Sequence, residues 1–185
     1  MDGERAVVLL RAVNVGGTGT LRMAAFEACL TSAGCTDART VLQSGNAVVR
    51  VAAPVSSIER PIHDALLKQA GVDADVFVRA AGEWQALVHA NPFVLEAETQ
   101  PSRLVAMVVR ETPARADVAR LRASMTGPER LAVGDRVLYI FYPDGQGRSK
   151  LTGATIERAL GTRSTARNWN TVAKLLTLVA ARATA

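Results

Sequence analysis

The chain has 185 residues, of which 49% are hydrophobic and 21% are charged, a composition typical of a globular protein. This length can bury a core without disulfide or metal staples, and it fits one domain or two small ones. No apolar run approaches the roughly 18–20 residues that a membrane span needs. The first apolar run follows an acidic start and is typical of a strand rather than a signal peptide, so we expect a cytoplasmic protein without a membrane partner.

The formal net charge is +5, carried by 19 Arg and 3 Lys against 17 acidic residues. A nucleic-acid or phosphate partner would account for this excess. A GC-rich genome would also account for it, because the chain is rich in alanine and its arginines are scattered along the sequence. Charge alone therefore does not decide whether the protein has a basic binding surface.

Cysteine and histidine give little support to a metal site. Cys29 and Cys35 are the only cysteines, and two cysteines do not complete a metal set. A reducing cytosol also disfavours a disulfide, so we interpret both as small buried hydrophobic residues. His63 and His89 lie in separate helical segments. We therefore expect no metal ion.

The first half predicts the element order β-α-β-β-α-β, which is that of the ferredoxin-like fold. Apolar runs of strand length alternate with segments in which apolar residues recur at helical spacing. Ser44-Gly45-Asn46 is a typical hairpin turn between two β-rich runs. The expected strands are 5–11, 40–43, 47–51 and 74–79, and the expected helices are 21–33, 56–70 and 82–89.

The second half repeats the pattern after a polar segment, 96–102, which we interpret as a linker. Its predicted order is β-α-β-β-α-α, with a helix in place of the last strand. The expected strands are 104–109, 130–133 and 136–142, and the expected helices are 115–125, 150–160 and one from about residue 168. We predict an α+β protein with two ferredoxin-like subdomains and antiparallel sheets, 1–95 and 103–185, the second ending in helices.

The loop after the first strand and the first hairpin turn are expected to meet. The first and third strands of a ferredoxin-like sheet are antiparallel neighbours, so both connections lie at one end. Two consecutive glycines allow backbone N–H groups to form an anion nest, although such motifs are also ordinary turn chemistry. The candidate ligand contacts at this end are Arg11, Asn14, Gly16, Gly17, Gln43, Ser44, Gly45 and Asn46.

Two C-terminal motifs supply further candidates. The Gly-rich loop 144–150 lacks P-loop spacing, so it is either a solvated turn or an anion contact at a helix start. In STARNWNTVAKLL (164–176), Trp169 belongs to the apolar stripe, and Asn168 or Thr165 suffices as the cap. Arg167, Asn170 and Thr171 are then not needed for the cap, and their donor groups suit either an anion at the helix start or a solvated first turn. The candidates here are Ser149, Lys150, Arg167, Asn168, Asn170 and Thr171.

These segments resemble the signature of the bacterial domain-of-unknown-function family 1697. The segments VVLLRAVNVGG, VLQSGN, NPF, SKL and RNWNTVAKLL are similar to the family's LLRGINVGG, IQSGN, NPF, SKL and TRNWNTV, in the same order. The resemblance implies an α+β fold with two ferredoxin-like subdomains. It implies no activity, because the family has no established one.

The chain departs from the family pattern at three positions. Ala12 stands where the family usually has Gly, Arg22 where it usually has Lys, and Ala166 where it usually has Thr. Ala12 limits backbone approach after the first strand. Arg22 keeps the positive charge but not lysine chemistry such as Schiff-base formation, so a catalytic Lys at that family position would be missing here.

Three functions stay open. The first is binding of a small anionic, phosphate-bearing ligand in a polar cleft. Whether the protein is an enzyme is undecided, since the motifs hold no His or Glu as a general base and Asp144 is the nearest carboxylate. The second is nucleic-acid binding through Arg and Lys, although only Tyr139 and Phe141 offer strand aromatics for stacking. The third is an interaction protein without a ligand. The motifs identify no catalytic residue and no cofactor.

Overall fold

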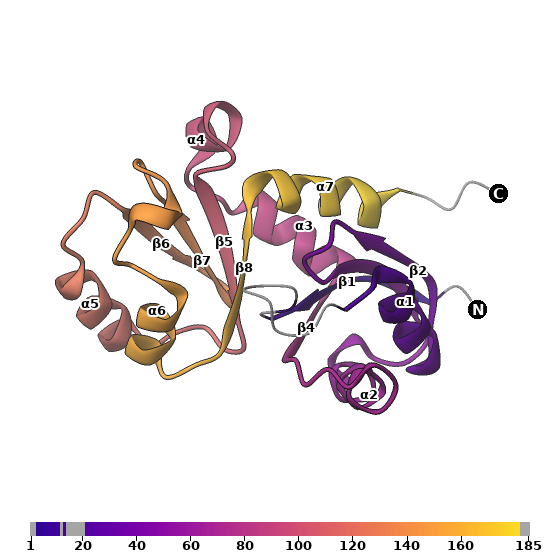
Figure 1. The fold of residues 1–185 in the computed structure, drawn as a ribbon. Coiled ribbons are helices and arrows are strands. Elements are labelled where there is room, and N and C mark those ends of the chain that lie inside the picture. The colour runs from indigo at the N-terminus through magenta and orange to yellow at the C-terminus, as the bar shows by residue number, and fades with distance from the viewer. Residues whose placement is uncertain (1–2, 12, 14–20, 182–185) are drawn as a thin grey trace. The chain divides into compact units, whose positions relative to one another are not determined.

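The protein is an α+β structure with two antiparallel sheets, as the sequence and the family resemblance predict, and each sheet has four strands (Figure 1). The computed structural model describes residues 3–11, 13 and 21–181. The chain divides into two compact units, which are residues 1–86 with 174–185 (the first unit) and residues 87–173 (the second unit). The expected division into subdomains 1–95 and 103–185, with a linker at 96–102, stays a prediction.

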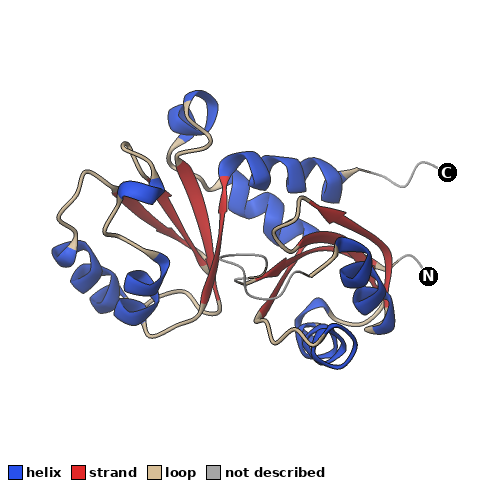
Figure 2. Cartoon of the chain, viewed as in Figure 1, coloured by secondary structure: helices blue, strands red, loops and turns tan. Residues whose placement is uncertain are grey.

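The first sheet has the strand order β2-β3-β1-β4, in which β1 pairs with both β3 and β4. This is the order of a ferredoxin-like sheet. Figure 2 draws the strands of both sheets in red. A π-helical turn continues the second helix. The elements are β1 (Glu4–Leu10), α1 (Met23–Ser32), β2 (Cys35–Val41), β3 (Asn46–Val51), η1 (Val55–Ser57), α2 (Glu59–Ala65), η2 (Leu66–Ala70), β4 (Val76–Ala80) and α3 (Ala81–His89).

The core of the first unit lies between the sheet and helices α1 and α2. Side chains alternate along a strand, so Ala6, Val8 and Leu10 of β1 share one face. Phe26 from α1 and Ile62 from α2 are fully buried in the same cluster. Burial of a side chain of this size contributes roughly 1.5–3 kcal/mol to the stability of the fold. The apolar stripes seen in the sequence therefore predict these helices.

The second sheet repeats this arrangement with the order β6-β7-β5-β8. Its core joins β5 and β7 to α5 and α6 through buried side chains that include Met107, Leu121, Ile140 and Ile156. Among the residues described, no helix is long and apolar enough to cross a membrane. The elements are α4 (Val94–Thr99), β5 (Leu104–Val109), α5 (Arg115–Ser124), β6 (Arg130–Gly134), β7 (Val137–Phe141), η3 (Gln146–Arg148), α6 (Gly153–Leu160), β8 (Ser164–Asn168) and α7 (Trp169–Ala180).

Strand β8 differs from the sequence prediction, which had a helix in place of this last strand. It pairs antiparallel with β5, so that Ser164 is opposite Val109 and Asn168 is opposite Val105. Its sequence, STARN, contains a single β-branched residue and does not signal a strand by itself. Pairing with the fully buried strand β5 stabilises β8, although the sequence of β8 has a low propensity for strand structure. A second difference is α4, whose six residues overlap the segment 96–102 that was expected to be a linker.

Each of the four edge strands forms a hydrogen bond with a charged helix side chain: three backbone amides donate to glutamates, and one carbonyl accepts from an arginine. The bonds join the backbone N–H of Thr40 in β2 to Oε1 of Glu27 (3.0 Å), that of Val78 in β4 to Oε1 of Glu59 (2.8 Å), that of Ser164 in β8 to Oε1 of Glu157 (2.8 Å), and Nη2 of Arg122 to the carbonyl of Leu131 in β6 (3.1 Å). Each covers a backbone group that an edge strand would otherwise present for pairing. In the first unit α1 covers one edge of the sheet and α2 the other, and in the second unit α5 and α6 do the same.

Candidate functional site

The end of β1 meets the β2–β3 turn, as the predicted strand order requires. The backbone N–H of Leu10 donates to the carbonyl of Gly45 at 2.7 Å. Gly45 has a φ of +69°, and a Cβ placed there would lie 2.5 Å from Cγ2 of Val13, so only glycine fits. The candidates Asn14, Gly16 and Gly17 lie outside the described residues.

Within this turn, Asn46 has structural partners. It is fully buried, and its Nδ2 donates to the carbonyl of Val41 and to Oγ of Ser44, both at 2.9 Å. Arg11 is half-buried beyond the end of β1, while Gln43 and Ser44 are exposed. Asn46 therefore fastens the hairpin. A ligand role for these residues stays a prediction.

The last helix has its own cap. Oδ1 of Asn168 accepts hydrogen bonds from the backbone N–H and the hydroxyl of Thr171, both at 3.1 Å, which is N-cap geometry. Trp169 is buried and its ring is tilted against that of Tyr139, with centroids 6.4 Å apart. Asn170 is exposed. The buried Trp169 thus anchors α7, and Asn168 caps the first turn of α7 through its hydrogen bonds with Thr171.

Arg167 lies in β8 and contacts its own strand. Its Nη1 donates to Oγ1 of Thr165 and to the carbonyl of Ala166, both at 2.8 Å. Burial lowers the pKa of Arg167 to about 10, although the guanidinium stays charged at neutral pH. Its binding role stays a prediction.

Ser149 and Lys150 line a cavity of about 360 Å³ in the second unit. Its walls are the loop 124–129 between α5 and β6, residues 142–145 after β7, residues 148–151, and Thr155 of α6. The remaining C-terminal candidates, Arg167, Asn168, Asn170 and Thr171, are not part of this lining. The two C-terminal motifs are therefore not brought together here.

Glu129 contacts Ser149 in this cavity and was not identified from the sequence. The Ser149 hydroxyl donates to Oε1 of Glu129 and accepts from the backbone N–H of Leu151 at 2.9 Å. A Cβ on Gly127 would collide with the Glu129 carboxylate, so this glycine leaves room for it. Glu129 precedes Ser149 by 20 positions and belongs to no motif, so only the tertiary fold reveals the pair.

Tyr142 forms part of the cavity wall, and the charge of Glu129 affects its pKa. Its hydroxyl donates to the carbonyl of Leu151 at 3.1 Å. Burial first, and then the negative charge of Glu129, raises the pKa of Tyr142 well above its ordinary value. The phenol is therefore a neutral donor at physiological pH.

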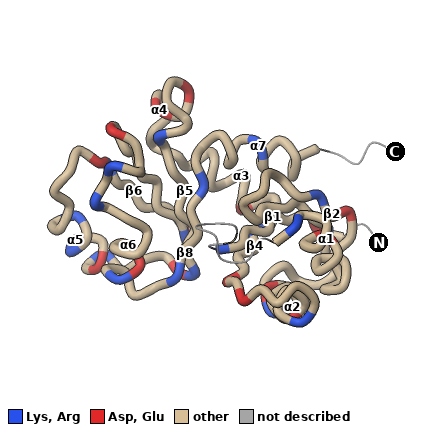
Figure 3. Tube along the Cα trace, in the orientation of Figure 1, with Lys and Arg blue, Asp and Glu red and all other residues tan. Residues whose placement is uncertain are grey.

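Four charged side chains line the cavity: Glu129, Asp144, Arg148 and Lys150. Figure 3 shows basic and acidic positions close together on the loops beside β6. Within the described part of the chain, neither Arg148 nor Lys150 forms an ion pair, with these carboxylates or with any other. Oε2 of Glu129 likewise accepts no hydrogen bond from a described residue. The cavity thus presents both signs of charge without internal neutralisation.

Ser149 has a carboxylate partner, but the lining contains no histidine to take its proton. The described residues contain no group of three or more His, Cys, Asp or Glu side chains able to hold a metal ion.

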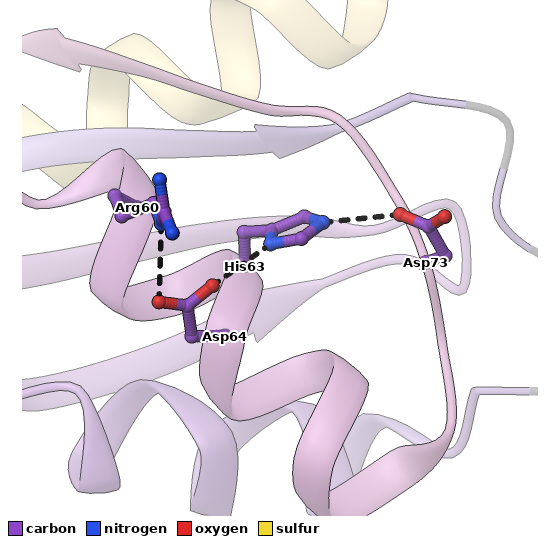
Figure 4. Close-up of polar contacts among 4 residues, drawn as sticks. All are labelled: Arg60, His63, Asp64 and Asp73. Atoms are coloured by element: carbon purple, nitrogen blue, oxygen red, sulfur yellow. Dashed lines mark hydrogen bonds and ion pairs between the residues drawn. The ribbon is translucent and has the colours of Figure 1, made fainter.

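A separate charged cluster lies on the surface of the first unit (Figure 4). Nε2 of His63 is 3.0 Å from Oδ1 of Asp73, and Nδ1 is 3.2 Å from Oδ1 of Asp64, which also pairs with Arg60. Hydrogen bonding to Asp73, and then to Asp64, raises the pKa of His63. The cluster ties α2 to the segment before β4 and lines no cavity described above.

Two ferredoxin-like sheets and a charged, ligand-sized cavity define a small α+β protein with a candidate binding site. Residues 4–139 match the sequence model of the family described as "Protein of unknown function (DUF1697)", and the chain belongs to this family. This match includes Glu129 and ends before Ser149 and Lys150.

A solved structure shares this fold. The chain is similar to a structure described as "conserved bacterial protein SP0830 from Streptococcus pneumoniae", with a TM-score of 0.72 and 16% identity over 95% of this chain and 98% of that one. At this identity the likeness shows the fold alone. No curated protein matches the chain in sequence.

Proposed function

We propose that the protein binds a small anionic ligand of the phosphate type in the cavity of the second unit, through Lys150 and Arg148. The observation that carries this proposal is that both cations line one cavity and neither has an ion-pair partner among the described residues. The cavity volume of about 360 Å³ falls within the usual range of ligand sites.

The two cations suit a phosphate in different ways. The guanidinium of Arg148 offers a planar fork of donors, and the ammonium of Lys150 is a compact point charge. Hydrogen bonds between such groups and phosphate oxygens are charge-assisted and roughly twice as strong as neutral ones. Candidates outside the cavity, such as Arg11, Asn46 and Arg167, are not needed for this proposal.

A thermal-shift panel at low salt tests it. The panel contains inorganic phosphate, nucleotides, sugar phosphates, coenzymes, and short DNA and RNA. A ligand at about 100 times its dissociation constant adds about 2.7 kcal/mol, or a rise in Tm of about 5–11 °C for a chain of this length. We expect such a shift with a small phosphate compound.

Matched variants locate the binding. Lys150→Ala should abolish the shift, whereas Lys68→Ala should keep it, because Lys68 is exposed on η2 and is not part of the cavity lining. Equal loss in both variants, or no shift with any small phosphate, contradicts the proposal. A shift with oligonucleotides alone, unchanged in Lys150→Ala, would instead favour a nucleic-acid-binding module. The strand aromatics Phe77, Tyr139 and Phe141 are buried and do not favour base stacking.

A further inference from the structure

We infer that the ligand of this cavity is a zwitterion, which carries an ammonium group for Glu129 in addition to the anionic group for Lys150 and Arg148. The inference rests on the proposed function and names the class of compound that the site takes. It starts from the charge balance of the lining, which contains two cations and two carboxylates, none of which forms an ion pair with a residue that the structure describes.

A simple phosphate does not match this balance. A phosphate monoester carries about −1.5 to −2 charges at pH 7, which the two cations would neutralise. The carboxylates would then stay beside an anion, and like charges at short range repel. Asp144 is exposed and can rotate toward water. Glu129 is only half-exposed, so the ligand has to satisfy it.

Glu129 is also held in place for such a contact. Its Oε1 accepts the Ser149 hydroxyl, and its carboxylate fits against Gly127. Oε2 accepts no hydrogen bond from a described residue and is therefore available as an acceptor. A partly buried carboxylate with an unfilled acceptor is stabilised by a cationic donor more than by a neutral one.

The position of the carboxylate inside the cavity is supported by Tyr142. This residue lines the same cavity, and the charge of Glu129 is the second cause, after burial, of its raised pKa. An ammonium group held by Glu129 would thus lie near a neutral phenol and a serine hydroxyl, with no competing cation paired to that carboxylate.

Three related compounds separate the charges, and isothermal titration calorimetry at low salt and neutral pH measures their binding. The probes are O-phosphoethanolamine, which carries both groups, ethyl phosphate, which lacks the amine, and ethanolamine, which lacks the phosphate. We expect O-phosphoethanolamine to bind at least about tenfold more tightly than ethyl phosphate, the effect of one added charge-assisted hydrogen bond. Ethanolamine alone should bind more weakly than either phosphate.

The variant Glu129→Gln tests the residue. Glutamine keeps the size of the side chain and still accepts from Ser149, but it removes the negative charge. We expect weaker binding of O-phosphoethanolamine together with equal or tighter binding of ethyl phosphate, so that their affinity ratio falls to about one. Retained ethyl phosphate binding also shows that the variant is folded. Gly127→Ala, which displaces the carboxylate without removing it, should lower the ratio in the same direction.

Asp144→Asn is the matched control, because it removes the other carboxylate of the cavity. The ratio should stay high in this variant, and a collapse there but not in Glu129→Gln would overturn the assignment to Glu129. Equal affinities of the wild-type protein for O-phosphoethanolamine and ethyl phosphate would overturn the zwitterion inference and leave the proposed function standing. No binding of either phosphate would overturn both.

Discussion

Replacing Asn46 by alanine separates a structural role from a ligand role at the first hairpin. The side chain is fully buried and gives two hydrogen bonds of 2.9 Å, one to the carbonyl of Val41 and one to Oγ of Ser44. Alanine removes both bonds and leaves a buried carbonyl without this donor. The hairpin turn loses the side chain that fastens it, and β3 begins at this residue.

The expected cost follows from these two bonds. A buried acceptor left without its partner costs about 1–3 kcal/mol, so we expect Asn46→Ala to lower the free energy of unfolding by about 2 kcal/mol. For a chain of this length each kcal/mol shifts Tm by about 2–4 °C, which gives a fall of about 4–8 °C. Ser44→Ala removes the hydroxyl that accepts from Asn46, and because Ser44 is exposed, water can replace this contact, so its cost should be about 0.5 kcal/mol.

Urea denaturation and thermal unfolding, both followed by circular dichroism, measure both variants and the double variant. Since Asn46→Ala already removes the bond to Ser44, the costs of the two single variants should not add fully in the double variant. A Tm within about 1 °C of wild type for Asn46→Ala would refute the structural reasoning. Such a result, combined with lost ligand binding, would instead support Asn46 as a binding residue.

Three further predictions concern stability. Leu42 is 52% exposed with a φ of +61°, so Leu42→Gly should relieve left-handed strain and raise the free energy of unfolding by about 0.5–1 kcal/mol in urea denaturation; a loss would refute this. The folded-state pKa of His63 is raised, so its stabilisation is present below the unfolded pKa of 6.5 and is lost as pH rises through the folded value. Wild type should therefore exceed His63→Gln in stability at about pH 5 and lose that advantage by about pH 8, and a constant difference would count against the cluster. Tyr139 donates to the buried carbonyl of Leu87 at 2.7 Å, so Tyr139→Phe should cost about 1–3 kcal/mol, measured by calorimetry, and an unchanged Tm would show that the bond contributes nothing.

The order of elements was largely predictable because it depends on local patterns. Burial of the strand 104–109 and of Val118 and Leu121 in α5 is visible as apolar patterns in the local sequence. The turn at Ser44-Gly45-Asn46 is likewise visible in its residue types. β8 was missed for two reasons. Its five residues are mostly polar, and the strand with which it pairs, β5, lies far earlier in the chain, with 59 positions from Val105 to Ser164. Local propensity does not carry that pairing.

The candidate site was less predictable for the same reason. Ser149 and Lys150 were found through a Gly-rich loop before a helix, which is a local signal. Glu129 stands in a loop with only a Gly-Pro turn beside it, and its contact with Ser149 depends on β6 and β7 bringing two loops together. Asn46 shows the opposite case, since an amide in a turn motif suits either a ligand or the turn itself, and burial separates the two.

The charged side chains that cover the sheet edges have a consequence for the dynamics of the backbone. Amide protons on edge strands usually exchange quickly with solvent, because they lack a partner in the sheet. Here the amides of Thr40, Val78 and Ser164 donate to glutamates carried by helices, so exchange at these positions requires a helix and a strand to separate together. We expect these three amides to exchange at rates closer to those of the central strands, and the two sheets to open as cooperative blocks rather than by fraying from their margins.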